Sequence, residues 1–401
     1  MSAPAELTVK PRHYKPLLAG HPWVFAEAVE KVTGEPKPGD EVRVRDERGA
    51  VLGRGYYSPG SAIAVRLLTR KDESCDAGLL RRRLADALSL RRETLGFDGS
   101  EQAPRTAYRL VHAEGDWLGG LVVDLYGDVA CVQIHTAGMD RRREALLAAL
   151  QELAGAVTIL DRSDARMRDL EGLNPPREEP MRGHAPEGPV EVRSHGARLA
   201  VDFESGQKTG LFLDQLDHQA WLARHARGRA MLDVFSYSGG FAVQAARAGA
   251  KSVALLERSA AALDAARENL ERNAIADAEL IEAEWQEGFA HLKSENRRFD
   301  LVVLDPPKFA RTKADVPQAL EGYRRLNAAA AELLNPGALL YTCSCSGNVS
   351  ELEFERAVAG GLAGSGRRAQ VLERRGHAPD HPVPPGFEQG RYLQGLLVRV
   401  L

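Results

Sequence analysis

The chain has 401 residues, enough for two or three domains, and 44% of them are hydrophobic, which is ample for sizeable cores. Its 53 Lys and Arg against 56 Asp and Glu give a net charge of −3, which excludes a uniformly basic nucleic-acid coat. No apolar run suits a membrane span, no signal-peptide core is present, and the four cysteines show no disulfide or paired metal spacing. These features predict a cytoplasmic protein with reduced thiols and no metal centre.

Residues 1–75 read as short strands cut by glycine turns, which predicts a small β-barrel or sandwich as the first domain. Its expected exposed face carries Arg43 and Arg45, with Tyr56 among the basic side chains. Cations interleaved with aromatic rings suit contact with RNA. The alternative is a solvated strand face with its tyrosines in the core, and the residues alone leave both open.

Residues 76–200 predict a central α+β domain. An amphipathic helix covers 76–95, and a hairpin-like β run follows at 108–135. The further elements expected are a helix near 139–154, a strand at 156–161, a proline- and glycine-rich loop at 170–190, and strands at 190–194 and 197–203.

Residues 201–401 alternate regularly between strands and helices, which predicts a Rossmann-like, doubly wound parallel sheet. The expected strands lie at 231–235, 252–256, 279–283, 300–305 and 338–344, with closing strands near 369–374 and 392–400. The expected helices include 216–227, 259–273 and 315–334. Active groups of such a sheet lie at the carboxyl ends of its strands.

Carboxylates stand at four successive strand ends of this sheet: Asp233, Glu257, Glu284 and Asp305. The turn after the first strand carries adjacent Gly239 and Gly240 instead of the three spaced glycines that accompany a pyrophosphate. This favours S-adenosylmethionine, a nucleoside cofactor without phosphate, although an ordinary glycine turn explains this stretch equally well. Glu257 is then expected to accept from ribose hydroxyls, and Glu284 with Trp285 to frame the adenine.

The sequence Asp-Pro-Pro-Lys-Phe at 305–309 predicts a stiff loop, because Pro306 and Pro307 lack N–H donors and turn carbonyls outward. Such a loop can hold a flat base by its exocyclic amine, with Phe309 to stack on it. A plain strand terminator is the alternative.

The neighbouring strand runs into Cys343 and Cys345, so a thiolate there would face the same crevice. A thiolate that attacks carbon 6 of a pyrimidine makes carbon 5 able to take a methyl group. A small buried residue is the commoner role of cysteine, and a metal site is weakly supported because no second Cys/His pair accompanies these two.

The C-terminal half resembles class I S-adenosylmethionine-dependent methyltransferases. Nearly the whole chain is similar to the RlmI-type cytosine carbon-5 methyltransferases of large-subunit ribosomal RNA. The matching motifs are HPWVF, GRGYYSPGSAIAVRLL, RLVHAEGDWLGGLVVDLYGD, GQKTGLFLDQ, DVFSYSGGFAVQAARAGA, DPPKF, SCSGN and DHPV…YLQG. The resemblance implies an RNA-binding PUA domain, a central α+β domain and a Rossmann-like catalytic domain, and it makes a homodimer plausible.

The resemblance also implies roles for particular residues. Cys345 is the nucleophile, because the family pattern is SCSG, and Lys308 or a water assists product release. The methyl-donor site falls on Gln207, Lys208, Thr209, Asp233, Tyr237, Gly239, Glu257, Glu284, Trp285 and Asp305. Two alternatives remain open: direct methylation of an exocyclic amine of RNA, and a catalytically inactive RNA-binding assembly factor.

Overall fold

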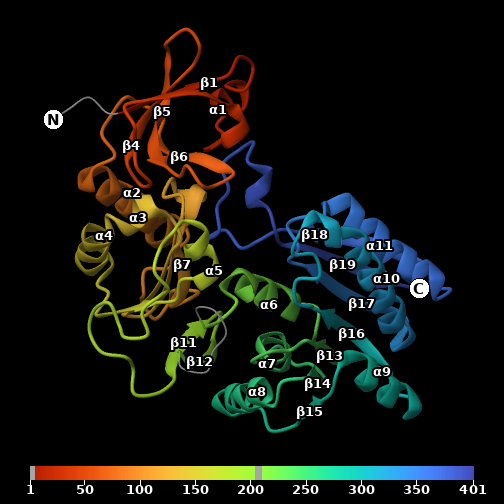
Figure 1. Cartoon of the computed structure of the whole chain (residues 1–401). Coiled ribbons are helices and arrows are strands. Elements are labelled where there is room, and N and C mark those ends of the chain that lie inside the picture. Colours follow the sequence, from red (N-terminus) through yellow and green to blue (C-terminus); the bar gives the residue numbers. More distant parts are fainter. Residues whose placement is uncertain (1–4, 204–209) are drawn as a thin grey trace. The chain divides into compact units, whose positions relative to one another are not determined.

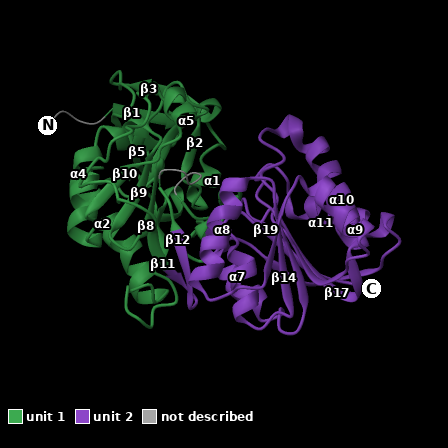
Figure 2. Cartoon of the chain, turned by 90° about the horizontal axis from the view of Figure 1, so that it is seen from below, with its two compact units in different colours: residues 1–192, 201–213, 379–390 green, residues 193–200, 214–378, 391–401 purple. Residues whose placement is uncertain are grey.

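The computed structural model describes residues 5–203 and 210–401. The chain divides into two compact units (Figure 2). The first comprises residues 1–192, 201–213 and 379–390, and the second comprises residues 193–200, 214–378 and 391–401. The division into three domains at residues 75 and 200 remains a prediction.

The N-terminal part of the first unit is a small, mostly antiparallel β-domain (Figure 1). Its elements are β1 (Ala5–Val9), α1 (Lys15–Leu18), β2 (Trp23–Phe25), η1 (Ala26–Ala28), β3 (Val29–Thr33), β4 (Glu41–Arg45), β5 (Val51–Tyr57) and β6 (Ile63–Thr69). The strand order is β2-β6-β5-β4-β1-β3, in which β1 and β4 pair in parallel. Val42 and Val44 are fully buried and alternate with partly exposed arginines, as predicted for a half-buried strand.

A second sheet of the first unit has the order β10-β9-β8-β7. Its strands are β7 (Ala107–His112), β8 (Leu121–Tyr126), β9 (Val129–Ile134) and β10 (Thr158–Asp161), with the short helices η3 (Ala113–Asp116), α3 (Ala137–Asp140) and α5 (Ala165–Leu170) nearby in sequence. The helices α2 (Ala77–Ser89) and α4 (Arg143–Ala149), each continued by a π-helical turn, η2 (Leu90–Thr94) and η4 (Leu150–Ala154), share one core with this sheet. Asp76 caps α2 by accepting from the Leu79 amide at 3.0 Å, so the predicted amphipathic helix is present.

The segment 379–390 joins the first unit although it lies near the C-terminus in sequence. Asp380 is fully buried and forms an ion pair with the equally buried Arg105 at 3.0 Å. Arg91 donates to the Asp380 carbonyl at 2.7 Å and holds both oxygens of Asp116, at 2.5 and 2.9 Å. Buried charges of this kind are stable only when paired, so they fix this segment in place.

The second unit is built on a seven-stranded sheet with the order β15-β14-β13-β16-β17-β19-β18. Its strands are β13 (Ala230–Val234), β14 (Ser252–Glu257), β15 (Ala278–Glu282), β16 (Phe299–Leu304), β17 (Leu334–Ser344), β18 (Ala369–Arg375) and β19 (Gln394–Val400). The strands from β15 to β17 are parallel, which confirms the predicted doubly wound fold. β19 instead runs antiparallel to both of its neighbours. In residues 376–393, which connect β18 to β19, the structure has the short η7 (Glu388–Gly390) and no α-helix, so no helical crossover returns the chain in parallel.

Helices cover both faces of this sheet (Figure 1). They are α6 (Leu216–Ala223), α7 (Gly240–Arg247), α8 (Ala260–Arg272), α9 (Trp285–Ser294), α10 (Val316–Glu332) and α11 (Glu351–Gly364), with the short η5 (Leu213–Gln215) and η6 (Lys313–Asp315). The strand order reverses at β13 and β16, so the loops after these two strands frame a crevice at the carboxyl edge of the sheet. A separate hairpin, β11 (Val190–Ser194) with β12 (Ala197–Val201), lies mostly within this unit, which includes residues 193–200. In the part of the chain that the structure describes, no helix is long and apolar enough to cross a membrane.

Candidate functional site

The turn between β13 and α7 has an unusual backbone. Phe235, Tyr237 and Gly239 all have positive φ, at 61°, 48° and 77°. A non-glycine residue in this region is strained, and such strain gathers at ligand sites. A Cβ added to Gly239 would lie 3.0 Å from a methyl of Leu255 and 3.1 Å from Ala266, so only glycine fits there.

Asp233 at the end of β13 is 1% exposed. Its Oδ2 accepts from the Ala242 amide at 3.1 Å, while Oδ1 has no hydrogen-bond partner among the described residues. Burial raises the pKa of Asp233 to about 8, and the nearby Asp305 and Glu257 add to the effect. An unpartnered buried oxygen beside a strained glycine turn fits a cofactor that brings a donor or a positive charge to this place.

Glu257 at the end of β14 is held by three backbone amides. It accepts from Tyr237 at 3.1 Å, from Arg258 at 2.9 Å and from Ser259 at 3.1 Å. Its carboxylate is therefore preorganised before any ligand is bound. The carboxylates and the turn, whose glycines are adjacent rather than spaced, fit a nucleoside cofactor without phosphate.

Glu284 is placed differently from the other predicted carboxylates. It lies two residues beyond β15, at the N-cap of α9, and its side chain is 51% exposed beside Arg258 at 3.3 Å. Trp285 is half-buried on the first turn of α9 and meets Phe289 edge-on at 5.6 Å. Gln207, Lys208 and Thr209 lie outside the described residues.

The acceptor loop, residues 305–309, follows β16 directly. The ring of Phe309 stacks on Tyr323 of α10, with centroids 4.7 Å apart and an interplanar angle of 30°. Pro306 is buried, whereas Pro307 and Lys308 are exposed.

A buried hydroxyl network fixes this loop to the end of β17. Ser346 Oγ accepts from the amides of Phe309 at 3.2 Å and Ala310 at 3.1 Å. The Tyr323 hydroxyl bridges Ser344 Oγ at 2.8 Å and Ser346 Oγ at 3.1 Å. Sequence reasoning missed Tyr323 and both serines, although the serines flank Cys345 on either side.

The two cysteines of this strand differ in exposure. Cys343 is fully buried within β17, and burial raises the pKa of its thiol well above the ordinary value. Cys345 lies just beyond the end of the strand and is partly exposed. Its Sγ is 3.9 Å from the Pro306 carbonyl oxygen, so the thiol adjoins the acceptor loop.

The structure corrects one predicted RNA contact in the first unit. Tyr56 is 4% exposed, its hydroxyl donates to the Cys75 carbonyl at 2.7 Å, and Arg142 lies over its ring. It is a core residue and offers no face to a base. Arg43 and Arg45 are partly exposed, but both pair with Glu6, at 3.1 and 2.9 Å.

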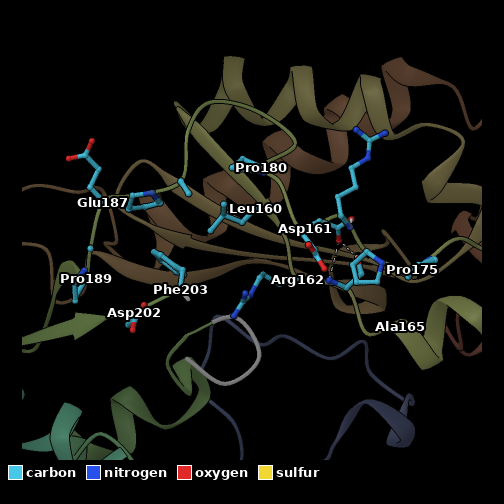
Figure 3. Close-up of a pocket in the computed structure, with 17 residues that line it drawn as sticks. Leu160, Asp161, Arg162, Ala165, Pro175, Pro180, Glu187, Pro189, Asp202 and Phe203 are labelled. Atoms are coloured by element: carbon cyan, nitrogen blue, oxygen red, sulfur yellow. Dashed lines mark hydrogen bonds between the residues drawn. The ribbon is translucent and has the colours of Figure 1, made fainter. Parts of the chain in front are cut away.

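A cavity of about 810 Å³ lies in the first unit beside β10 (Figure 3). Proline-rich stretches line it together with Phe203. Asp161 accepts there from Ser163 Oγ at 2.5 Å and from the Arg177 amide at 3.2 Å. The charged lining residues are Arg162 and Arg177 against Asp161, Glu178, Glu187 and Asp202. Because the acidic groups outnumber the basic ones, this cavity does not suit a polyanion.

Within residues 5–203 and 210–401, no group of three His, Cys, Asp or Glu side chains could hold a metal ion. At the carboxyl edge of the second unit, the described residues offer carboxylates, hydroxyls and the partly exposed Cys345 thiol.

Comparison with known proteins identifies the family. The chain matches the PUA-like domain family over residues 7–70 and the S-adenosylmethionine-dependent methyltransferase family over residues 111–382. It is 39% identical to Ribosomal RNA large subunit methyltransferase I of Tolumonas auensis, over 96% of this chain and 97% of that protein. The protein of the same name from Shewanella amazonensis is also 39% identical, over 98% and 99%.

Among solved structures, SMU.776, described as a methyltransferase complexed with SAH, has a similar fold with a TM-score of 0.83. That similarity covers 98% of this chain and 99% of the other at 21% identity, so it bears on the fold alone. The family match spans more than half of the chain, and its cofactor is S-adenosylmethionine. The chain belongs to the S-adenosylmethionine-dependent methyltransferases, in the family of the ribosomal RNA large subunit methyltransferases I.

Proposed function

We propose that this enzyme transfers a methyl group from S-adenosylmethionine to carbon 5 of a cytosine in large-subunit (23S) ribosomal RNA, through a covalent bond to Cys345. The names of the curated relatives support the RNA substrate. The observation that carries the chemistry is the partly exposed Cys345 thiol, 3.9 Å from the Pro306 carbonyl, at the crevice of the second unit.

On the donor side, bound S-adenosylmethionine supplies an electrophilic methyl group. Glu257 accepts from the ribose hydroxyls with a carboxylate already oriented by three amides. Asp233 offers its unpartnered Oδ1, and Gly239 lets the ligand approach the backbone. The remaining proposed donor-site residues are Gln207, Lys208, Thr209, Tyr237, Glu284, Trp285 and Asp305.

On the acceptor side, the Cys345 thiolate forms a bond to carbon 6 of the cytosine, and the displaced ring electrons make carbon 5 nucleophilic. Carbon 5 takes the methyl group and then loses its proton, and the returning electron pair breaks the bond to sulfur. Lys308 or a water takes that proton. Pro306, Pro307 and Phe309 position the base.

The PUA-like domain supplies further RNA contacts, with Arg43 and Arg45 exchanging carboxylate partners for phosphates. A ribosomal RNA substrate implies a cytoplasmic enzyme. A homodimer remains a prediction.

Methyl transfer to unmethylated 23S RNA, followed with radiolabelled cofactor, tests the proposal. Cys345→Ala should lower the rate roughly 10³-fold or more, because it removes the nucleophile. Cys343→Ala, two residues earlier and buried, is the matched control and should keep most activity. Wild-type enzyme should also form a covalent adduct on 5-fluorocytosine RNA, which Cys345→Ala cannot.

Each alternative gives a different result. Full activity of Cys345→Ala would overturn the covalent mechanism and favour direct methylation of an exocyclic amine. An inactive assembly factor is favoured if calorimetry detects no S-adenosylmethionine binding. Bisulfite sequencing of ribosomal RNA from a deletion strain identifies the nucleotide.

A further inference from the structure

A cavity of about 550 Å³ in the second unit borders the acceptor loop. Lys308 and Phe309 line it from the loop, Trp285 lines it from α9, and Gly322 and Arg325 line it from α10. The predicted nucleophile and the buried carboxylate of β13 are not among its lining residues. The cavity therefore adjoins the place where the methyl group is transferred but does not include the nucleophile.

Aromatic surface forms part of its wall. The Phe309 ring rests on Tyr323 at 4.7 Å and still borders the cavity. A Cβ added to Gly322 would lie 3.1 Å from Phe309 Cδ2. Glycine destabilises a helix interior, so its presence in α10 needs a reason, and here it lets the ring lie close against the helix. The half-buried Trp285 adds a second aromatic surface.

Two positively charged side chains that line the cavity are available to bind a ligand. Lys308 and Arg325 are exposed, and neither forms an ion pair within the described part of the chain. The two carboxylates that line the cavity are already engaged. Asp315 accepts from the Thr312 amide at 2.7 Å, and Glu321 pairs with Arg324. Free cations beside aromatic rings are the combination that binds a nucleotide of a single strand.

We propose that this cavity binds a nucleotide neighbouring the target cytosine in an unstacked RNA strand. Its base lies against Phe309, a ring that the two neighbouring nucleotides share, and its phosphate contacts Arg325. The inference rests on the proposed function, because the acceptor loop connects the two places. Pro306 touches the thiol, and two residues later Lys308 lines the cavity, a span of at most about 7 Å of chain. That span is comparable to one nucleotide step, so a strand bound at the thiol reaches the cavity.

The test compares Arg325→Ala with Arg298→Ala, which removes an exposed arginine just before β16, at the opposite edge of the sheet. Binding of an unmethylated 23S RNA fragment is measured by filter retention at several salt concentrations, with S-adenosylhomocysteine present. Arg325→Ala should weaken RNA binding about 5- to 10-fold and reduce the slope of log K against log salt by about 0.7, the value for one phosphate contact on a single strand. Arg325→Lys should restore most of both, and Arg298→Ala should match wild type.

A second variant tests the aromatic wall without changing charge. Gly322→Val should narrow the cavity and weaken RNA binding while leaving the salt slope and the Kd for S-adenosylmethionine unchanged. If Arg325→Ala binds RNA with the wild-type affinity and salt slope and still methylates 23S RNA, the proposed subsite is wrong and the proposed function stands. If the wild-type enzyme does not methylate 23S RNA, the proposed function itself fails.

Discussion

Ser346→Ala tests whether the buried hydroxyl network positions the acceptor loop. Ser346 Oγ is the acceptor for the amides of Phe309 and Ala310, and both Ser346 and Ala310 are fully buried. Alanine leaves the Ala310 amide without an acceptor and takes one partner from the Tyr323 hydroxyl. Each buried group left unsatisfied costs about 1–3 kcal/mol, and the half-buried Phe309 amide can find water. We therefore expect a loss of about 2–3 kcal/mol in the free energy of unfolding.

Ser344→Ala is the matched control for this prediction. Ser344 is equally buried and bonds the same tyrosine hydroxyl at 2.8 Å. Within the described residues its other hydrogen bond runs to the Ser346 amide at 3.3 Å and none reaches the loop. Both variants should lose stability, whereas kcat should fall roughly 10- to 100-fold only in Ser346→Ala, because displacing the loop by about 1 Å misplaces the base.

Stability is read from urea unfolding, in the transition that added S-adenosylmethionine shifts, since that transition reports the cofactor-binding unit. Methyl transfer at saturating RNA gives kcat, and calorimetry gives the cofactor Kd, which should stay within about twofold of wild type because the donor side is unchanged. Equal kcat in wild type and both variants would refute the argument and reduce the network to a stabilising role.

Two further predictions concern buried carboxylates. The raised pKa of Asp233, about 8, means that the folded, cofactor-free protein keeps this proton while the unfolded chain loses it near pH 4, so stability should fall as pH rises from 4 to 8. The contribution is at most about 1.4 kcal/mol per pH unit, and Asp233→Asn should flatten the profile; identical profiles would contradict the assignment. Asp380→Asn should destabilise the first unit by about 3–5 kcal/mol, because it removes the counter-charge that Asp380 provides to the fully buried Arg105. Urea unfolding checks this, and a loss below about 1 kcal/mol would contradict it.

Much of the second unit could be predicted because its signals are local. Strands β13, β14 and β16 are largely apolar, and each has a carboxylate within its last two residues or directly after it. The strained turn could be predicted only in part. Gly239 has a residue-specific reason for positive φ, but Phe235 and Tyr237 adopt it because the surrounding chain imposes it.

The prediction that Tyr56 is exposed was wrong, because the residues that bury it lie outside its own strand. The register shift between β5 and β6 places its extra residue, Leu68, in β6, so Tyr56 keeps the side of β5 that strand alternation assigns to it. A Cβ on Gly138 would lie 2.3 Å from the tyrosine ring, so α3 covers what strand alternation alone leaves exposed. Long-range packing of this kind decides which aromatic residues remain available to RNA.

The choice between Cys343 and Cys345 depends on where one strand ends. Residues two apart in a strand share a face, so the Cys-x-Cys pattern alone treats the two thiols alike. β17 ends at Ser344, which leaves Cys343 paired opposite Gly395 inside the sheet and places Cys345 beyond the last ladder pair. Burial raises the pKa of the Cys343 thiol, whereas Cys345 is partly exposed, and Ser346 next to it accepts from the Phe309 amide of the acceptor loop. A strand longer by two residues would bury both cysteines, so the end of β17 is as much a determinant of the proposed chemistry as the thiol itself.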